Sequence, residues 1–224
     1  MLTPRDRKII LHLGYHGWLS HEQLQVLEFP SYQTLQRRIR RELFKNNWID
    51  RKYLPDRKGN QTAIFRLTKK GKKWFRHDTG NKVKIPRFSQ LKVPHKLMVN
   101  ELIIQLKKEK IIPLSGFGLE KKCGSIRPDA VVNYNEPFAI EVDLSGGETQ
   151  EFICKKWRQY EREYMQGNLN FRYVVWYSHK RMNCLYEWIE KKSQLEPLFI
   201  DKVDKIFKVI QHIKLGIKNN VISL

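Results

Sequence analysis

Three short helices, each with a recognisable start, are predicted in the first 47 residues, and their order constrains the fold more than any other feature of the chain. Thr3 and Asp6 stand three residues apart around Pro4, as in a capping box with proline at the first helical position. Gly14 and Gly17 are expected to end this first helix. A serine followed by a glutamine, in the run SHEQ, starts the second helix in the same way, before a proline stops it.

The third helix is predicted to follow a cap at Ser31. Leu35, Ile39 and Leu43 recur every four residues and form its buried stripe. The opposite face is polar and basic, and its candidate contacts to DNA are Gln33, Gln36, Arg37, Arg40, Arg41 and Lys45.

Two strand-like runs follow, over residues 48–55 and 61–68, joined by the turn sequence DRKGN. Three helices followed by a basic hairpin is the order of a winged helix-turn-helix, whose third helix enters the major groove of DNA. Arginine pairs with guanine and glutamine with adenine, which suits this helix. Contacts to DNA phosphates, which position the protein without reading the base sequence, are expected from Arg51, Lys52, Arg57, Lys58, Lys69 and Lys70.

The charge of the chain supports a polyanionic partner. Lysine and arginine number 43 against 23 acids, and residues 1–90 hold 21 of the basic residues but only 7 of the acids, a balance of +14. An amphipathic helix with a solvated basic face is the simpler interpretation of the third helix taken alone. A membrane-surface helix is disfavoured, because the apolar stripe is needed for the domain core.

Other features bound the class of protein. The three cysteines are odd in number and far apart, so neither a disulfide framework nor a zinc ribbon is indicated. The sequence starts without an apolar signal-like segment and has no apolar run of 18 residues, so a cytoplasmic location is expected. A basic stretch with glycine and two prolines over residues 77–94 is predicted to link a first domain, 1–76, to a second, 95–224.

The second domain contains an acidic stretch. No lysine or arginine occurs from Pro128 to Cys154. The run FAIEVDL is strand-like, and its alternation places Glu141 and Asp143 on one face. If it pairs with the preceding run AVVNY as a hairpin, Asp129 falls beside them. Clustered carboxylates raise each other's pKa, and Mg2+ or Mn2+ would relieve the repulsion. The alternative is the solvated face of a half-exposed strand.

The segments around this hairpin indicate an α/β core with a mixed central sheet. Helices are predicted over residues 95–110 and 148–167, and a buried strand over 171–178. Amphipathic helices after residue 180 would pack on the sheet or form a dimer seam through Leu185, Trp188, Ile189, Val203, Ile206, Phe207 and Ile210.

The acidic stretch resembles the PD-(D/E)XK nuclease superfamily, which has a restriction-endonuclease-like fold. Pro128 and Asp129 look like its PD dipeptide and Glu141 like its later acid, while Glu101 could match an acid on the preceding helix. Asp143 stands where the pattern has lysine. Divergent members supply the lysine from the next helix, where this chain has Lys155 and Lys156.

Roughly residues 1–180 resemble the replication-relaxation family of plasmids and other mobile elements. The run LTPRDRKIILHLGYHG, the later LTKKG, the PD dipeptide, Glu141-Val142-Asp143 and the spacing from Lys156 to Tyr160 carry the resemblance. It implies a winged helix-turn-helix followed by a nuclease-like domain that acts on the element's own DNA. The expected partners are double-stranded DNA, a second copy of the chain, and replication or transfer proteins, with no membrane.

Two function classes follow. The first is a sequence-specific DNA-binding protein whose nuclease-like domain does not cut. The second is a Mg2+-dependent endonuclease that nicks DNA, with Asp129, Glu141, Asp143 and either Lys155 or Lys156 as the catalytic set. A transcriptional regulator is a third alternative. A lysine that reaches the carboxylates would favour the enzyme.

Overall fold

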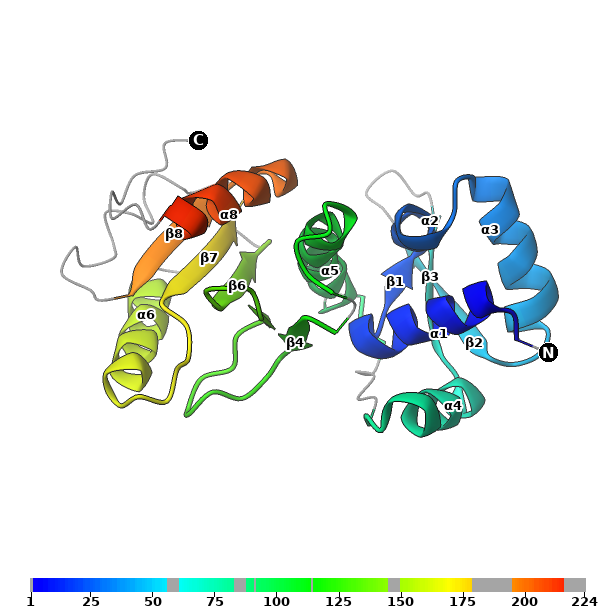
Figure 1. Cartoon of the computed structure of the whole chain (residues 1–224), viewed down its shortest axis with the longest axis horizontal. Coiled ribbons are helices and arrows are strands. Elements are labelled where there is room, and N and C mark those ends of the chain that lie inside the picture. Colours follow the sequence, from blue (N-terminus) through cyan, green and yellow to red (C-terminus); the bar gives the residue numbers. More distant parts are fainter. Residues whose placement is uncertain are drawn as a thin grey trace. The chain divides into compact units, whose positions relative to one another are not determined.

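The computed structural model describes residues 2–55, 61–82, 88–90, 92–113, 115–144, 150–178 and 195–215. These residues form an α+β protein that divides into two compact units, Met1–Ile104 and Gln105–Leu224, called here the N-terminal and C-terminal units (Figure 1). The division falls inside helix α5 (Lys92–Lys108), whereas a linker was predicted over residues 77–94.

Local capping defines the helices of the N-terminal unit. Helix α1 (Pro4–His16) starts with the predicted capping box. The side chains of Thr3 and Asp6 each accept a hydrogen bond from the other residue's backbone N–H. Helix α2 (His21–Glu28) starts with a second capping box, formed by Ser20 and Gln23. Of the two glycines expected to end α1, Gly17 does so, whereas Gly14 lies within the helix. The helix continues to His16, and Gly17, whose φ is 80°, forms the C-cap.

The predicted third helix consists of two segments. Helix α3 (Tyr32–Arg38) is capped by Ser31, and it passes directly into the π-helical segment η1 (Ile39–Phe44). Leu35, Ile39 and Leu43 are all buried, as the period of four predicts. Their burial turns the opposite side of α3 and η1 outward.

A three-stranded antiparallel sheet completes this unit, in the order β1-β3-β2. The predicted hairpin is confirmed by β2 (Ile49–Pro55) and β3 (Gln61–Leu67), which pair with Arg51 opposite Phe65. Strand β1 (Leu19–Ser20), which the sequence did not predict, pairs with the other edge of β3. The hairpin turn, with Arg57 and Lys58, lies outside the described residues.

Helix α4 (Lys69–Thr79) follows β3 and was also not predicted. Thr68 caps its start, and Gly80 ends it in the left-handed conformation. The Phe75 ring packs edge-on against Tyr15 of α1, with 5.1 Å between the ring centroids. One hydrophobic core cluster, which includes Ile9, Leu13, Leu35, Phe65, Phe75 and Ile104, joins α1, α3, α4 and the sheet.

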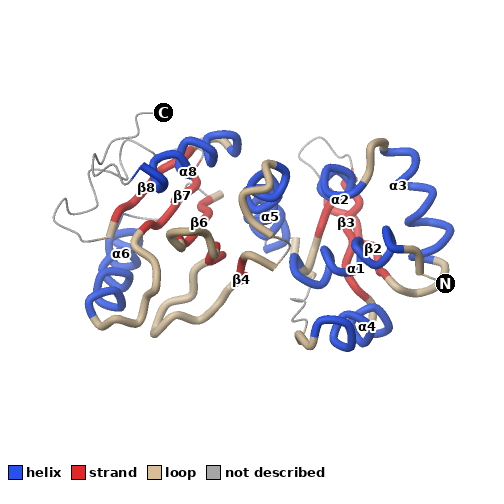
Figure 2. Tube along the Cα trace, viewed as in Figure 1, coloured by secondary structure: helices blue, strands red, loops and turns tan. Residues whose placement is uncertain are grey.

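The C-terminal unit contains a mixed five-stranded sheet, in the order β4-β5-β6-β7-β8 (Figure 2). Strands β4 (Phe117–Leu119), β5 (Ala130–Val132) and β6 (Phe138–Asp143) are antiparallel, and β5 and β6 form the predicted hairpin, with Ala130 opposite Ile140. Strands β7 (Tyr173–Ser178) and β8 (Glu196–Ile200) continue from β6 in parallel.

Helix α6 (Gln150–Met165) connects β6 to β7 and covers one face of this sheet. Its Ile153, Trp157 and Tyr160 pack in one core with sheet residues that include Ala139, Val174 and Trp176. Ala139, Glu141 and Asp143 share a strand face by alternation, so this face of β6 is directed toward α6.

The sheet is followed by the short segment η2 (Val203–Lys205) and helix α8 (Ile206–Leu215). Ile206 and Ile210 are buried, as the amphipathic pattern predicts. Leu185, Trp188 and Ile189 lie outside the described residues. In the described part of the chain, no helix is both long and apolar enough to cross a membrane.

Candidate functional site

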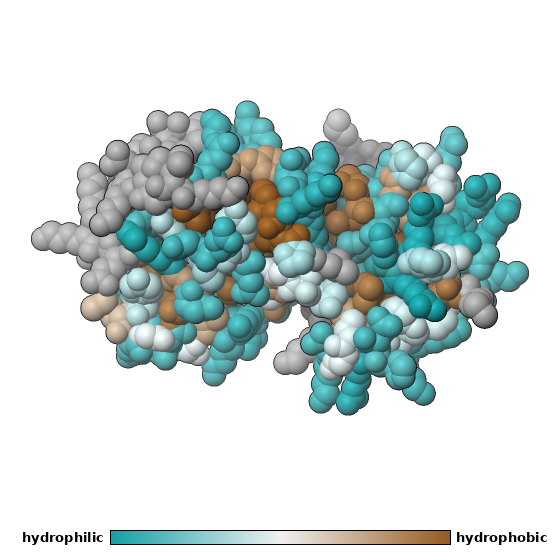
Figure 3. Space-filling model, viewed as in Figure 1, coloured by the Kyte–Doolittle hydropathy of each residue, from teal (hydrophilic) through white to brown (hydrophobic). Residues whose placement is uncertain are grey.

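The outer face of α3 and η1 carries the polar residues that the sequence assigned to DNA. Gln33, Arg37, Arg40, Arg41 and Lys45 are exposed, and Gln36 is partly exposed. Figure 3 shows hydrophilic residues gathered along this side of the N-terminal unit. The helix therefore presents a cationic surface directly opposite its buried stripe.

The hairpin contributes cations in a different way. Lys52 is exposed on β2, whereas Arg51 is half-buried between two aromatic rings. The Arg51 guanidinium lies 5.3 Å from the centroid of Phe44 and 5.0 Å from that of Tyr53. Such stacking holds the side chain in one orientation and leaves its charge available.

Of the other predicted phosphate contacts, Lys69 and Lys70 lie on α4. Lys69 is exposed in the first turn. Lys70 donates a 2.9 Å hydrogen bond to the Asn46 carbonyl oxygen and lies 4.2 Å from the centroid of the Trp48 ring. Lys70 therefore connects α4 to the segment between η1 and β2, while Lys69 is directed to solvent.

Sequence reasoning missed Arg38, which fastens α3 to the start of α1. Its Nε donates to Asp6 Oδ1 at 2.6 Å, its Nη2 donates to Asp6 Oδ2, and Nη2 also lies 3.2 Å from Thr3 Oγ1. Burial alone would raise the pKa of Asp6, but the hydrogen bonds from Arg38 and Thr3 outweigh it and hold that pKa below its usual value. The partners are 32 residues apart, so no local pattern could have revealed the pair.

In the C-terminal unit, Glu141 lies in a buried cluster between β6 and α6. Only 1% of its surface is exposed. Lys156 Nζ donates to Glu141 Oε2 at 2.8 Å, and the Tyr160 hydroxyl donates to Oε1. Lys156 also lies 5.5 Å from the centroid of the Trp176 ring. Asp129, just before β5, accepts a 2.9 Å hydrogen bond from the Val142 backbone N–H.

Burial dominates the electrostatics of this cluster. It raises the pKa of Glu141 to about 7, with the Lys156 charge opposing the shift and the Asp129 charge adding to it. Burial also raises the pKa of Tyr160 well above its usual value, and the neighbouring Glu141 strengthens that effect. Tyr160 therefore serves as a hydrogen-bond donor.

The other predicted catalytic and metal residues are placed as follows. Asp143 is buried on the same strand face as Glu141, two residues further along β6. Lys155 is exposed on α6, whereas Lys156 faces the sheet. Glu101 lies in the N-terminal unit, where its Oε2 accepts a 3.1 Å hydrogen bond from Gln23. The structure thus brings together Asp129, Glu141 and Lys156, and adds Tyr160.

This donor set does not fit the three-carboxylate cation site expected from the sequence. Among the described residues, no three His, Cys, Asp or Glu side chains gather in a way that could hold a metal ion. The ammonium group of Lys156 already lies beside Glu141, in the position that a cation would need. Binding of Mg2+ or Mn2+ stays a prediction.

The fold and these residues define an α+β protein that combines a basic, helical N-terminal unit with a mixed-sheet unit holding a buried carboxylate–lysine cluster. The chain belongs to the replication-relaxation family, whose model matches residues 11–173. The matched range includes α3, the hairpin and the whole Asp129–Glu141–Lys156–Tyr160 cluster. No curated protein and no solved structure matches the chain.

Proposed function

We propose that this protein binds double-stranded DNA sequence-specifically and acts in the replication or relaxation of a plasmid or other mobile element. Membership of the replication-relaxation family supports that role. In this proposal the N-terminal unit is a winged helix-turn-helix, with α3 and η1 as the recognition helix and the β2–β3 hairpin as the wing.

The exposed arginines of α3 and η1 are the observation that carries the proposal. Arg37, Arg40 and Arg41 face solvent while Leu35, Ile39 and Leu43 are buried beneath them. Arginine can donate two hydrogen bonds to a guanine edge, and exposed glutamines on the same face can pair with adenine. Lys52 and Lys69, exposed on β2 and α4, would contact phosphates and set the register of the helix on DNA.

Arg40→Ala tests this assignment. A preferred site is first selected from a random duplex library with the full chain, and fluorescence anisotropy then measures affinity for that site and for a scrambled duplex. Arg40→Ala should weaken binding to the selected site by roughly 1–3 kcal/mol and reduce the preference over the scrambled duplex. Arg162→Ala, which removes an exposed arginine from α6, provides the matched control. Equal affinities for Arg40→Ala and Arg162→Ala would contradict the assignment.

A second candidate function, cleavage of DNA by the C-terminal unit, is favoured by one specific contact. Lys156 reaches Glu141 from the next helix, beside Asp129. A lysine in this position could stabilise negative charge on a phosphate. The unit would then be nuclease-like, and its carboxylates would have to rearrange before they could hold a cation.

A plasmid-nicking assay distinguishes cleavage from binding alone. Supercoiled plasmid is incubated with the full chain in Mg2+ or Mn2+, and relaxed product is measured. If the C-terminal unit cuts, Asp129→Asn and Lys156→Met should abolish nicking, whereas Lys155→Met should leave it intact. Plasmid that stays supercoiled with the wild-type chain would eliminate this candidate and leave the DNA-binding proposal standing.

A further inference from the structure

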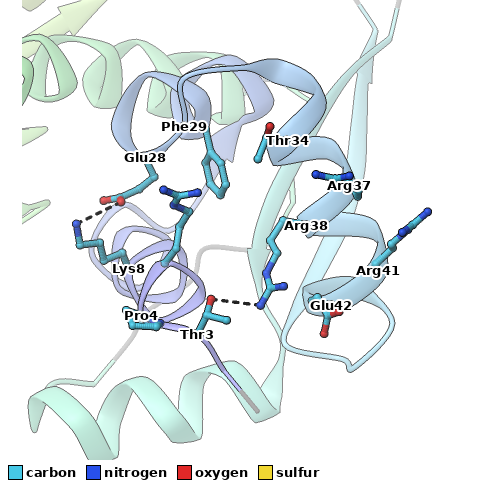
Figure 4. Close-up of a pocket in the computed structure, with 11 residues that line it drawn as sticks. Thr3, Pro4, Lys8, Glu28, Phe29, Thr34, Arg37, Arg38, Arg41 and Glu42 are labelled. Carbon is cyan, nitrogen blue, oxygen red and sulfur yellow. Dashed lines mark hydrogen bonds and ion pairs between the residues drawn. The ribbon is translucent and has the colours of Figure 1, made fainter.

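A concave, strongly basic site lies at one end of the N-terminal unit. Its volume is about 830 Å³, and it is bounded by the start of α1, the end of α2 and one side of α3 and η1 (Figure 4). Arg37 and Arg41 of its lining were predicted to contact DNA. Arg5, Lys8 and Arg38 line the same cleft and were not among the predicted contacts.

The charges in this cleft do not cancel. Five cationic side chains line it, against two carboxylates, Glu28 and Glu42. Lys8 pairs with Glu28 at 3.6 Å, and Arg38 pairs with Asp6. In the part of the chain that the structure describes, no ion pair neutralises the three remaining arginines, Arg5, Arg37 and Arg41. The cleft is therefore a focus of positive potential.

Two of its guanidinium groups are held in place before any ligand arrives. Arg5 lies over the ring of Phe29, with its Cζ 5.2 Å from the ring centroid, and Phe29 itself is only 7% exposed. Arg38 is fixed by Asp6 and Thr3, as the dashed contact to Thr3 in Figure 4 shows. Fixed donors lose little conformational entropy on binding, so they favour a ligand that matches their geometry.

The geometry points to a phosphate-binding cleft. We infer that it receives a phosphodiester group of DNA that flanks the recognition helix, with Arg5 of α1 and Arg41 of η1 among its donors. Arginine's planar fork matches phosphate oxygens, and the cleft combines such forks from α1, α3 and η1. Phosphate contacts carry no sequence information, so this site would position the protein rather than select the DNA site. The inference rests on the proposed DNA-binding function and adds α1 to its interface.

The salt dependence of binding tests the cleft separately from sequence recognition. Anisotropy titrations of the full chain with a labelled 24-base-pair duplex of random sequence give the slope of log affinity against log salt concentration. Arg5→Gln should reduce the steepness of this slope by about 0.9, the value for one lost phosphate contact, without changing the preference for a selected site. Arg7→Gln is the matched control, because Arg7 is an exposed arginine of α1 outside the cleft.

A second variant and a second probe keep the outcomes distinct. Arg41→Gln should also reduce the slope, together with a loss of preference for the selected site, because Arg41 also lies on the recognition face. Circular dichroism establishes that each variant is folded. Inorganic pyrophosphate tests whether a free phosphate also binds. It should raise the melting temperature of the wild-type chain and of Arg7→Gln, but not that of Arg5→Gln.

These measurements test phosphate binding in the cleft and DNA binding by the protein separately. If the wild-type chain binds no duplex while pyrophosphate stabilises it through Arg5, DNA is the wrong source of the phosphate. The proposed function then fails and the phosphate site remains. If Arg5→Gln and Arg7→Gln behave alike with both probes, the cleft is not a phosphate site, whatever Arg40→Ala shows about DNA recognition.

Discussion

Lys156 and Glu141 form an ion pair, 2.8 Å from Nζ to Oε2, in which the carboxylate is 1% exposed and the lysine side chain 29% exposed. The pair joins α6 to the centre of the mixed sheet. Burial of a carboxylate is costly unless a cation and hydrogen bonds compensate for the lost water. Here Lys156 supplies the charge and Tyr160 the hydrogen bond, and together they offset part of the cost of burying Glu141.

Glu141 should make the stability of the protein depend on pH. Its pKa is raised by burial from 4.5 to about 7, so the folded chain holds this proton more tightly than the unfolded chain does. Stability should therefore fall as the pH rises from about 5 to 8, by up to roughly 3 kcal/mol from this group. Urea denaturation at both pH values measures the change. Glu141→Gln should remove most of it, and an unchanged pH dependence in that variant would refute the assignment.

Replacing Lys156 should leave Glu141 buried without its cation. Lys156→Met is expected to lower the free energy of unfolding by about 2–4 kcal/mol at pH 8, and by less at pH 5, where Glu141 can be protonated. Lys155→Met, one residue away on the exposed side of α6, should change stability by less than about 0.5 kcal/mol. Similar losses for the two variants would show that the ion pair contributes nothing specific.

Arg38 should stabilise the N-terminal unit more than its exposed neighbours do. Arg38→Met removes the cation that holds the buried Asp6 carboxylate, at an expected cost of about 2–4 kcal/mol at pH 7. Because the pKa of Asp6 is lowered in the folded chain, this contribution should be present at neutral pH and be lost in acid. Arg40→Met serves as the control, since Arg40 is exposed. Equal midpoints of urea denaturation for both variants at pH 7 would disprove the role of the pair.

Local patterns in the sequence predicted much of this fold. Both capping boxes were predicted because their partners, such as Thr3 and Asp6, are only three residues apart. Alternation predicted β6, and a tight turn predicted its pairing with β5, which brings Asp129 close to Glu141. Each of these features involves residues close together in the sequence, so the local pattern of residue types is enough to predict it.

Features that depend on tertiary packing were not predictable in the same way. Strand β1 has two residues, too few to show a period. Helix α4 begins with a run of lysines around Gly71, and only packing explains that glycine, because a Cβ there would lie 2.4 Å from the Trp48 carbonyl oxygen. Which of Lys155 and Lys156 reaches Glu141 depends on how α6 is rotated about its axis where it packs on the sheet.

Gly14 offers a sharp test of the contact between α1 and α4. A Cβ at this position would lie 2.1 Å from two carbon atoms of the Phe75 ring, far inside van der Waals contact. Glycine within a helix is normally unfavourable compared with alanine, so close packing rather than helix termination accounts for it here. Gly14→Ala should therefore lower the free energy of unfolding by about 1–3 kcal/mol, although alanine is the better helix former.

A double-mutant cycle with Phe75→Leu checks the cause. If the ring is what excludes the methyl group, Gly14→Ala should cost clearly less in the Phe75→Leu background than in the wild-type chain, giving an interaction energy of about 1 kcal/mol or more. Urea denaturation of the four proteins supplies the measurement. Additive costs, or a Gly14→Ala variant more stable than the wild type, would mean that α4 does not press on α1 at Gly14.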